Sequence, residues 1–314
     1  MRHIAPRARS WVLSAVPAIL LLAGCDRSPT EPLIPSIETA KGPKTLPEMV
    51  AFSSNHEGIG ERAIYTMAFD GLYTTKRVTN PGDGVADNHP DFAPGSARLA
   101  FTRTSASGAS EIYTIGSNGK QLRQLTNFGA VSMMPVYSPD GTRIAFLSDK
   151  DGDINAFVMN VDGTNVQRVS NTFLLGSKLS WSANGAAIYF MNYESADNSY
   201  RLWRWTLLSG GEILMVCYTT VCTSPTGDYT SDRIIYEEKT TPLAPPILKL
   251  FDVATGANTP VPVLPARVGG WKLDGSRYVT VSDSTWTLQT IDPVSGAVMS
   301  LPTPGEVMWP TWSR

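Results

Sequence analysis

The sequence predicts an all-β protein, a six-bladed β-propeller with four-stranded blades, and three observations favour this fold. Related twelve-residue segments begin at positions 90, 135, 179, 225 and 269, a period of 44 to 46 residues. The chain contains 26 Gly and 23 Pro, while charged residues make up only 17%, which indicates many turns and few long helices. A small polar residue followed by Gly also recurs once per repeat. Four short strands per 40 to 50 residues are typical of a propeller blade.

The segment from 135 to 170 illustrates how one blade is expected to form. "PVYS" alternates like a first strand, and "SPDG" is a turn in which Pro139 presets φ while Gly141 is free to take a positive φ. "RIAFLS" is a second strand, "AFVMNV" a third, and "VQRVSN" a fourth. Aspartate followed by glycine between the last two strands favours a hairpin. Six such turns predict six blades: Asp70-Gly71, Asn118-Gly119, Asp162-Gly163, Ser209-Gly210, Thr255-Gly256 and Ser295-Gly296.

The two ends of the repeat region predict how the ring closes. The chain finishes on "WPTWSR" (309–314), a first strand that lacks a second, and the region opens on "EMVAFSSN" (48–55), a second strand that lacks a first. We therefore expect residues 310–314 to pair with the first blade, which removes exposed sheet edges. The propeller is expected to span 46–314.

The N-terminal segment is predicted to export and anchor the protein. Arginines at 2, 7 and 9 precede an apolar run from Trp11 to Leu22, which is too short to span a bilayer and suits a signal peptide over 1–24. "LAGC" (22–25) resembles the bacterial lipoprotein signal, which implies lipidation of Cys25. A proline-rich tether follows over 25–45. We expect the domain in the periplasm, lipid-anchored to the bacterial cell envelope at either membrane.

The repeat "P-x-x-SPDG-x-RIAF-x-S…I-x-x-MN-x-DG…RVS" resembles the WD-like repeat of the TolB propeller family. The resemblance covers about 46–314 and implies a six-bladed propeller of the envelope that acts through contact with another envelope protein. Residues 26–45 leave no room for the additional α/β domain that precedes the propeller in TolB. The sequence thus predicts a TolB-like scaffold module, monomeric, with no cofactor. The net charge of −2 means that basic residues are not in excess, so the sequence does not favour binding to the phosphates of nucleic acid.

Features of catalysis are weak in this sequence. Beyond the signal peptide there are two histidines, His56 and His89, too few for a three-imidazole metal site, and no G-x-S-x-G motif occurs. The run from Asp149 to Asp153 begins like a calcium loop but lacks the distant bidentate Glu. We expect no catalytic residue and no metal, although a glycan- or peptide-binding propeller and a propeller lyase or hydrolase stay open as alternatives.

Two groups of residues are the candidate sites. Cys217 and Cys222 are expected to form a disulfide if the domain is exported to an oxidising compartment. Most tryptophans fit packing between blades. Where the chain enters each blade, the repeat places five residues that we predict as a binding face: His89, Met133, Met134, Met308 and Trp309.

Overall fold

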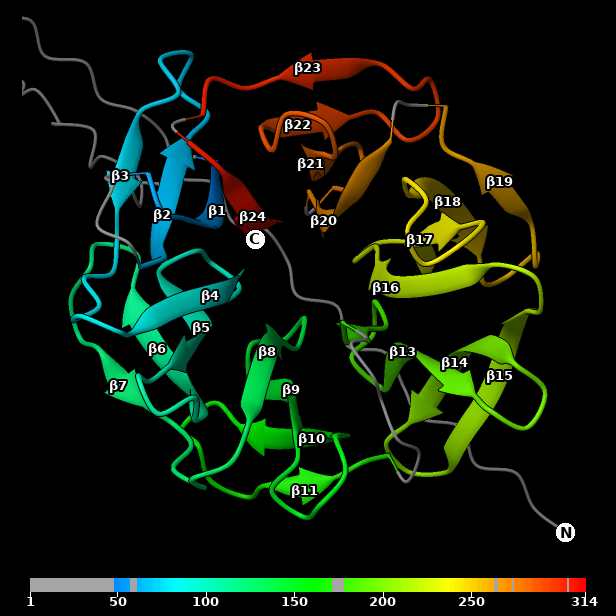
Figure 1. Ribbon diagram of the computed structural model, residues 1–314, viewed down its shortest axis with the longest axis horizontal. Helices are drawn as coiled ribbons and strands as arrows, with labels where there is room; N and C mark the ends of the chain where they lie inside the picture. The colour runs from blue at the N-terminus through cyan, green and yellow to red at the C-terminus, as the bar shows by residue number, and fades with distance from the viewer. Residues whose placement is uncertain (1–47, 57–60, 171–177, 263–264, 273, 304) are drawn as a thin grey trace, which may run out of the picture. The chain divides into compact units, whose positions relative to one another are not determined.

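The described part of the chain is built from β-strands that form six four-stranded antiparallel sheets arranged in a ring, and it contains no helix (Figure 1). This computed structural model describes residues 48–56, 61–170, 178–262, 265–272, 274–303 and 305–314. Within these ranges no helix is long and apolar enough to cross a membrane. The expected signal peptide, Cys25 and tether lie outside the described residues. The prediction of an all-β six-bladed propeller is confirmed.

The first three blades follow one another in chain order, and their strands are given from the channel outward. Blade 1 consists of β24 (Val307–Trp312), β1 (Met49–Ser54), β2 (Ala63–Ala68) and β3 (Thr75–Arg77). Blade 2 consists of β4 (Ala86–Phe92), β5 (Arg98–Thr104), β6 (Ser110–Gly116) and β7 (Arg123–Gln124). Blade 3 consists of β8 (Ser132–Tyr137), β9 (Arg143–Ser148), β10 (Asn155–Asn160) and β11 (Gln167–Arg168).

The other three blades repeat the same order. Blade 4 consists of β12 (Ser180–Trp181), β13 (Ala187–Glu194), β14 (Ser199–Thr206) and β15 (Gly210–Cys217). Blade 5 consists of β16 (Val221–Gly227), β17 (Arg233–Lys239), β18 (Ile247–Asp252) and β19 (Asn258–Pro260). Blade 6 consists of β20 (Ala266–Trp271), β21 (Tyr278–Ser282), β22 (Leu288–Ile291) and β23 (Val298–Ser300).

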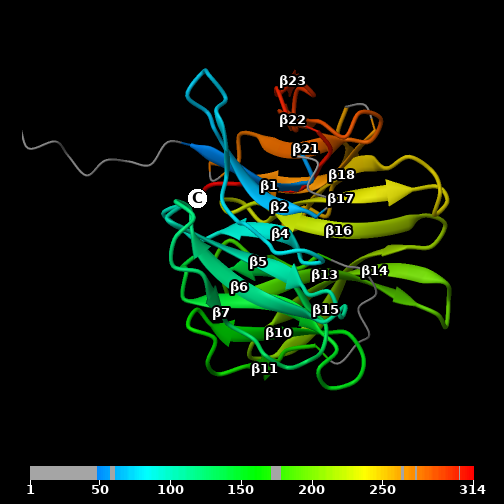
Figure 2. The ribbon, with the colours of Figure 1, turned by 60° about the vertical axis from the view of Figure 1, so that its left-hand side comes forward.

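This antiparallel order gives the ring two faces. On one, which we call the crossover face, the chain passes from the second to the third strand of a blade and from one blade to the next. The opposite face, the turn face, carries the tight turns between the first two and the last two strands. Figure 2 shows the sheets stacked around the ring from the side. The six predicted hairpin glycines on the turn face all take positive φ, between 70° and 88°, a conformation that costs glycine no side-chain clash.

Repeat residues that recur in the sequence connect neighbouring blades. The guanidinium of Arg143 in blade 3 lies 4.8 Å from the ring of Trp181 in blade 4, and its Nη2 donates to the carbonyl of Gly185 at 2.9 Å. Arg233 in blade 5 makes the same two contacts with blade 6, through the Trp271 ring and the Gly275 carbonyl. In blades 3 and 5 this arginine therefore links its blade to the next through a cation–π contact and a charge-assisted hydrogen bond.

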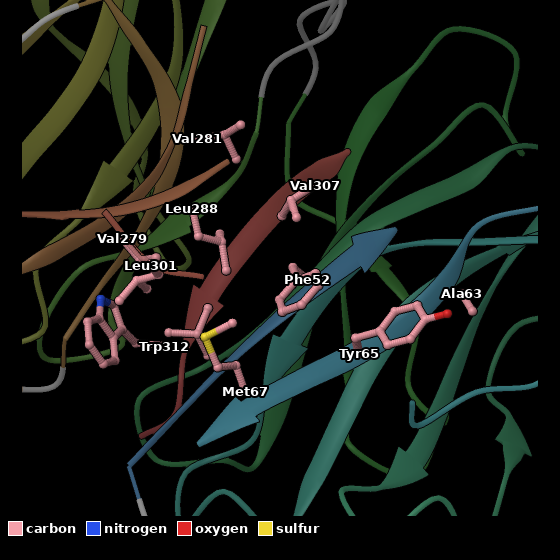
Figure 3. Close-up of a cluster of buried hydrophobic side chains, with 11 residues drawn as sticks. Phe52, Ala63, Tyr65, Met67, Val279, Val281, Leu288, Leu301, Val307 and Trp312 are labelled. Carbon is pink, nitrogen blue, oxygen red and sulfur yellow. The ribbon is translucent and has the colours of Figure 1, made fainter. Parts of the chain in front are cut away.

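The ring closes as the sequence predicted. β24 pairs antiparallel with β1 and is the innermost strand of blade 1, with Val50 opposite Trp312. The strand is longer than expected, since it begins at Val307, and it ends at Trp312. Trp312 is 1% exposed and packs among side chains of blades 1 and 6 (Figure 3). Closure thus joins the two ends of the repeat region through a buried apolar contact as well as backbone hydrogen bonds.

Candidate functional site

A β-bulge at one recurring slot shapes the channel. The innermost strand of blades 1, 2, 3 and 5 has one more residue than its partner at this point, and the extra residue takes a positive φ of 53° to 56°. These residues are Trp309, His89, Met134 and Ser224, each directly before a proline. Bulges re-aim side chains, and left-handed backbone at residues other than glycine costs free energy and clusters at functional sites.

A fifth residue occupies this slot in blade 4. Lys178 lies on the same channel and donates from Nζ to the carbonyl of Gly269 in blade 6 at 2.7 Å. Burial lowers the pKa of Lys178 to about 8, against a partial opposing effect of Asp91. The ammonium therefore remains largely charged at neutral pH and ties blades 4 and 6 together across the channel.

His89 lies against Trp309, with ring centroids 4.4 Å apart. Its Nδ1 is 3.2 Å from Oγ1 of Thr102, which also accepts the backbone N–H of Met134 at 3.0 Å. The Thr102 hydroxyl thus lies between the backbone of blade 3 and the His89 ring. Burial, and then the charge of Lys178, lower the pKa of His89 to about 3. The imidazole is neutral at pH 7.

Two cavities adjoin this ring of residues. A small one of about 20 Å³ lies between His89, Met134, Lys178 and Trp309. The other, which we call the mouth cavity, has a volume of about 140 Å³ and lies where blades 5, 6 and 1 meet. Its apolar wall consists of Val281, Trp286, Val307, Met308 and Trp309, and its polar wall of Lys178, Ser224, Glu237 and Arg267. Arg267 pairs with Asp283 at 2.8 Å and lies 4.8 Å from the Trp286 ring.

The channel is closed toward the turn face by Arg314. Its side chain, 3% exposed, donates from Nη2 to both carboxylate oxygens of Asp91 and from Nη1 to the carbonyl of Tyr137. Its guanidinium lies 4.2 Å from the ring of Tyr229. These partners belong to blades 2, 3 and 5, so one arginine from blade 1 reaches across the axis. Access to the two cavities is consequently from the crossover face.

The structure brings together four of the five residues predicted as a binding face. His89, Met134 and Trp309 line the small cavity, and Met308 lines the mouth cavity beside Trp309. Met133 lines neither and packs against the core between blades 3 and 4. Sequence reasoning missed Lys178, although it occupies the repeat slot of His89 and Met134. It also missed Arg267, Trp286 and the Arg314–Asp91 pair.

The other candidate residues lie elsewhere. The sulfurs of Cys217 and Cys222 are bonded, which links β15 of blade 4 to β16 of blade 5. His56 is exposed on the crossover face. In the ranges that the structure describes, no three His, Cys, Asp or Glu side chains form a group that could hold a metal ion. Cys25 lies outside these ranges.

The fold and this site define a six-bladed propeller whose central channel opens on one face. The chain belongs to the family described as the TolB beta propeller domain, whose family model matches residues 72–264. The family expected from the repeat is therefore confirmed.

The chain is similar to several known proteins, and it spans only part of the length of the relatives named TolB. The Protein TolB homolog of Chlorobium luteolum is 31% identical over 94 residues, which are 30% of this chain and 21% of that protein. The crystal structure of TolB from Acinetobacter baumannii matches with a TM-score of 0.69 at 18% identity, covering 84% of this chain and 66% of that one. A chain of the nidogen/laminin complex matches with a TM-score of 0.66 at 11% identity, covering 85% and 98%. These structural likenesses show the fold alone.

Proposed function

We propose that this protein is a binding module of the bacterial cell envelope, anchored by lipid at Cys25, which holds a segment of a partner protein at the mouth of its channel. Family membership and the export signal in the sequence support the location. The site itself carries the proposal for binding. The proposal does not include catalysis.

The observation that carries this function is the convergence of Trp309, Met308, Trp286 and Arg267 on one cavity. Tryptophan, methionine and arginine are enriched where proteins bind one another, and tryptophan and arginine dominate the binding energy of such contacts. The mouth cavity could accept one apolar side chain of a partner while Lys178, Glu237 and Arg267 meet its polar groups. Closure by Arg314 limits the ligand to the crossover face.

The environment of His89 weighs against an enzyme. A general acid or base works best with a pKa near the working pH, whereas the pKa of His89 is lowered to about 3. Its Nδ1 is also engaged with the Thr102 hydroxyl, 3.2 Å away. We assign His89 a structural role, in which its ring packs on Trp309 and supports the channel wall.

Site-specific photocrosslinking in intact cells tests the proposal. A benzophenone amino acid at Met308, beside the mouth cavity, should yield a crosslinked adduct with a protein. The matched control is the same amino acid at Leu208, which is fully exposed on the turn face. An adduct from Met308 that is absent from Leu208 is expected. Identical adducts from both positions, or none from Met308, would contradict binding at the mouth.

A further inference from the structure

A third hollow, of about 410 Å³, lies on the crossover face away from the channel, where blade 4 meets blade 5. Figure 1 shows β15 and β16, the strands on either side of this crossover. Three tyrosines line the hollow: Tyr193, Tyr200 and Tyr218. We call it the tyrosine groove. None of these three tyrosines lines the two channel cavities.

Strand register explains how two of the rings come to share one surface. Tyr193 of β13 pairs with Tyr200 of β14, and Tyr200 pairs in turn with Cys217 of β15. Directly opposed residues on neighbouring strands present their side chains on the same face of a sheet. The two rings lie 5.1 Å apart, and the Tyr193 hydroxyl donates to Oδ1 of Asn198 at 2.7 Å. Both rings are therefore held in fixed positions.

The third tyrosine is carried by a short loop that the disulfide closes. Cys217 and Cys222 are bonded across residues 218–221, and both are buried in the contact between blades 4 and 5. Thr220 in this loop donates from Oγ1 to Glu238 at 3.0 Å. Tyr218 itself is 64% exposed. A covalent link at the base and a hydrogen bond at the side thus present an exposed aromatic ring on a loop with little freedom to move.

The lining of the groove is uncharged and combines aromatic rings with hydrogen-bonding groups. Besides the tyrosines, the groove is lined by the Asn198 amide, by hydroxyls of Thr219, Thr220, Thr240 and Thr241, and by the apolar Val221 and Pro242, and none of its described lining residues is charged. Hydroxyls and amides both donate and accept hydrogen bonds, which matches the hydroxyls of a sugar. Exposed aromatic rings cover the apolar faces of pyranose rings, whereas ionic ligands would need charges that this lining lacks.

We propose that the tyrosine groove binds a neutral oligosaccharide, with Tyr218 and Tyr193 stacking on sugar rings and the asparagine and threonine side chains bonding sugar hydroxyls. The disulfide-closed loop forms one wall of the site before the ligand arrives, which lowers the entropy cost of binding. This site is independent of the proposed partner at the channel mouth.

The test is titration calorimetry of the purified full-length protein with three neutral hexasaccharides, namely chitohexaose, cellohexaose and maltohexaose. Binding of at least one of them is expected. Tyr218→Ala should weaken it at least about tenfold, a loss of roughly 1.4 kcal/mol, while Tyr218→Phe retains most of the affinity because the ring remains. Phe128→Ala is the matched control, since Phe128 is as exposed as Tyr193, at 39%, but lies outside the groove. It should leave the affinity unchanged.

Tyr218 projects into solvent, so its replacement is expected to leave folding intact, and the melting temperature of each variant verifies this. Absence of binding by all three sugars overturns the proposal, as does binding that survives Tyr218→Ala combined with Tyr193→Ala. A proline-rich peptide is the other ligand that aromatic grooves accept. A decaproline peptide that binds with dependence on Tyr218, where the sugars do not, would reassign the groove to peptide.

Discussion

Arg314 and Asp91 are 223 positions apart in the chain, yet Nη2 of the arginine lies 2.7 and 2.6 Å from the two carboxylate oxygens. Asp91 also accepts the backbone N–H of Tyr137 at 2.8 Å and the hydroxyl of Thr311 at 3.3 Å. One ion pair thus connects the inner strands of blades 1, 2 and 3. The C-terminal residue of the chain is thereby bound to the inner strand of blade 2.

Removing one partner of this pair should destabilise the propeller strongly. Arg314→Met leaves the Asp91 carboxylate buried without its cation, which typically costs about 3–5 kcal/mol. The double variant Arg314→Met with Asp91→Leu should recover part of that loss, because no uncompensated charge remains. Urea unfolding of both variants measures the difference. A loss below about 1 kcal/mol in the single variant would contradict a stabilising role.

Deletion of residues 309–314 should prevent closure of the ring. It removes most of β24 from blade 1, exposes β1 as a sheet edge, and takes Trp312 out of the cluster in Figure 3. Trp312→Ala alone should cost about 3–5 kcal/mol as a large-to-small change in a core. The deletion should therefore unfold or aggregate, as size-exclusion chromatography and thermal melting would reveal. A monomeric deletion variant with an unchanged melting temperature would be incompatible with the role given to β24.

The stability of the propeller should depend on His89 in acid. The pKa of His89 is lowered from 6.5 to about 3 in the folded protein. Between these two values the unfolded chain binds a proton that the folded chain does not, so this residue contributes a loss of stability as pH falls from 6.5 toward 3. Asparagine also tolerates the left-handed backbone at this position. The melting temperature of the His89→Asn variant should therefore fall less steeply than that of the wild type as pH decreases from 6.5 toward 3.

The control for this titration is His56→Asn, since His56 is exposed on the surface. The slope of melting temperature against pH should be the same in this variant as in the wild type. Equal slopes in all three proteins would mean that His89 is not shielded from water and protons as the structure indicates.

The disulfide should stabilise the domain modestly. In the chain-entropy relation, closing so short a loop contributes about 2 kcal/mol. Cys217→Ser together with Cys222→Ser should therefore lower the melting temperature by a few degrees. The same variant should also weaken any sugar bound in the tyrosine groove, since Tyr218 loses its fixed position. Calorimetric melting of oxidised wild type and variant measures the first effect, and an unchanged melting temperature would contradict it.

Cys25→Ala should release the protein from membranes without unfolding it. Anchoring requires the acyl chains that the N-terminal cysteine of a lipoprotein carries, while the propeller is a separate compact unit. Carbonate-washed membranes should retain the wild type and the Cys217→Ser/Cys222→Ser variant but lose Cys25→Ala. Sedimentation of Cys25→Ala with washed membranes would disprove lipidation as the anchor.

Local chemistry allowed much of the propeller to be predicted. Each hairpin glycine was recognisable because a residue pair such as Asp162-Gly163 favours a tight turn whatever surrounds it. Arg143 and Arg233 occupy the same position of the repeat in the sequence, whereas their stacking on Trp181 and Trp271 depends on how neighbouring blades pack. The number of blades and the closure of the ring could be predicted as well. The repeat region begins with a second strand that lacks a first and ends with a first strand that lacks a second, so pairing these two strands completes one blade.

The sites depended on tertiary structure, because they consist of residues from different blades. His89, Met134 and Trp309 share a repeat slot and were predicted to lie on one face, but only ring closure sets the distances between them. The hydrogen bond from Lys178 to the Gly269 carbonyl and the ion pair between Arg314 and Asp91 each occur once in the ring. The repeat pattern reveals only contacts that recur from blade to blade, so it could not predict them. Likewise, Tyr193, Tyr200 and Tyr218 form one surface because strand register and the Cys217–Cys222 link bring them together. The sequence by itself determined the blades, and the geometry of the closed ring decided which side chains meet between them.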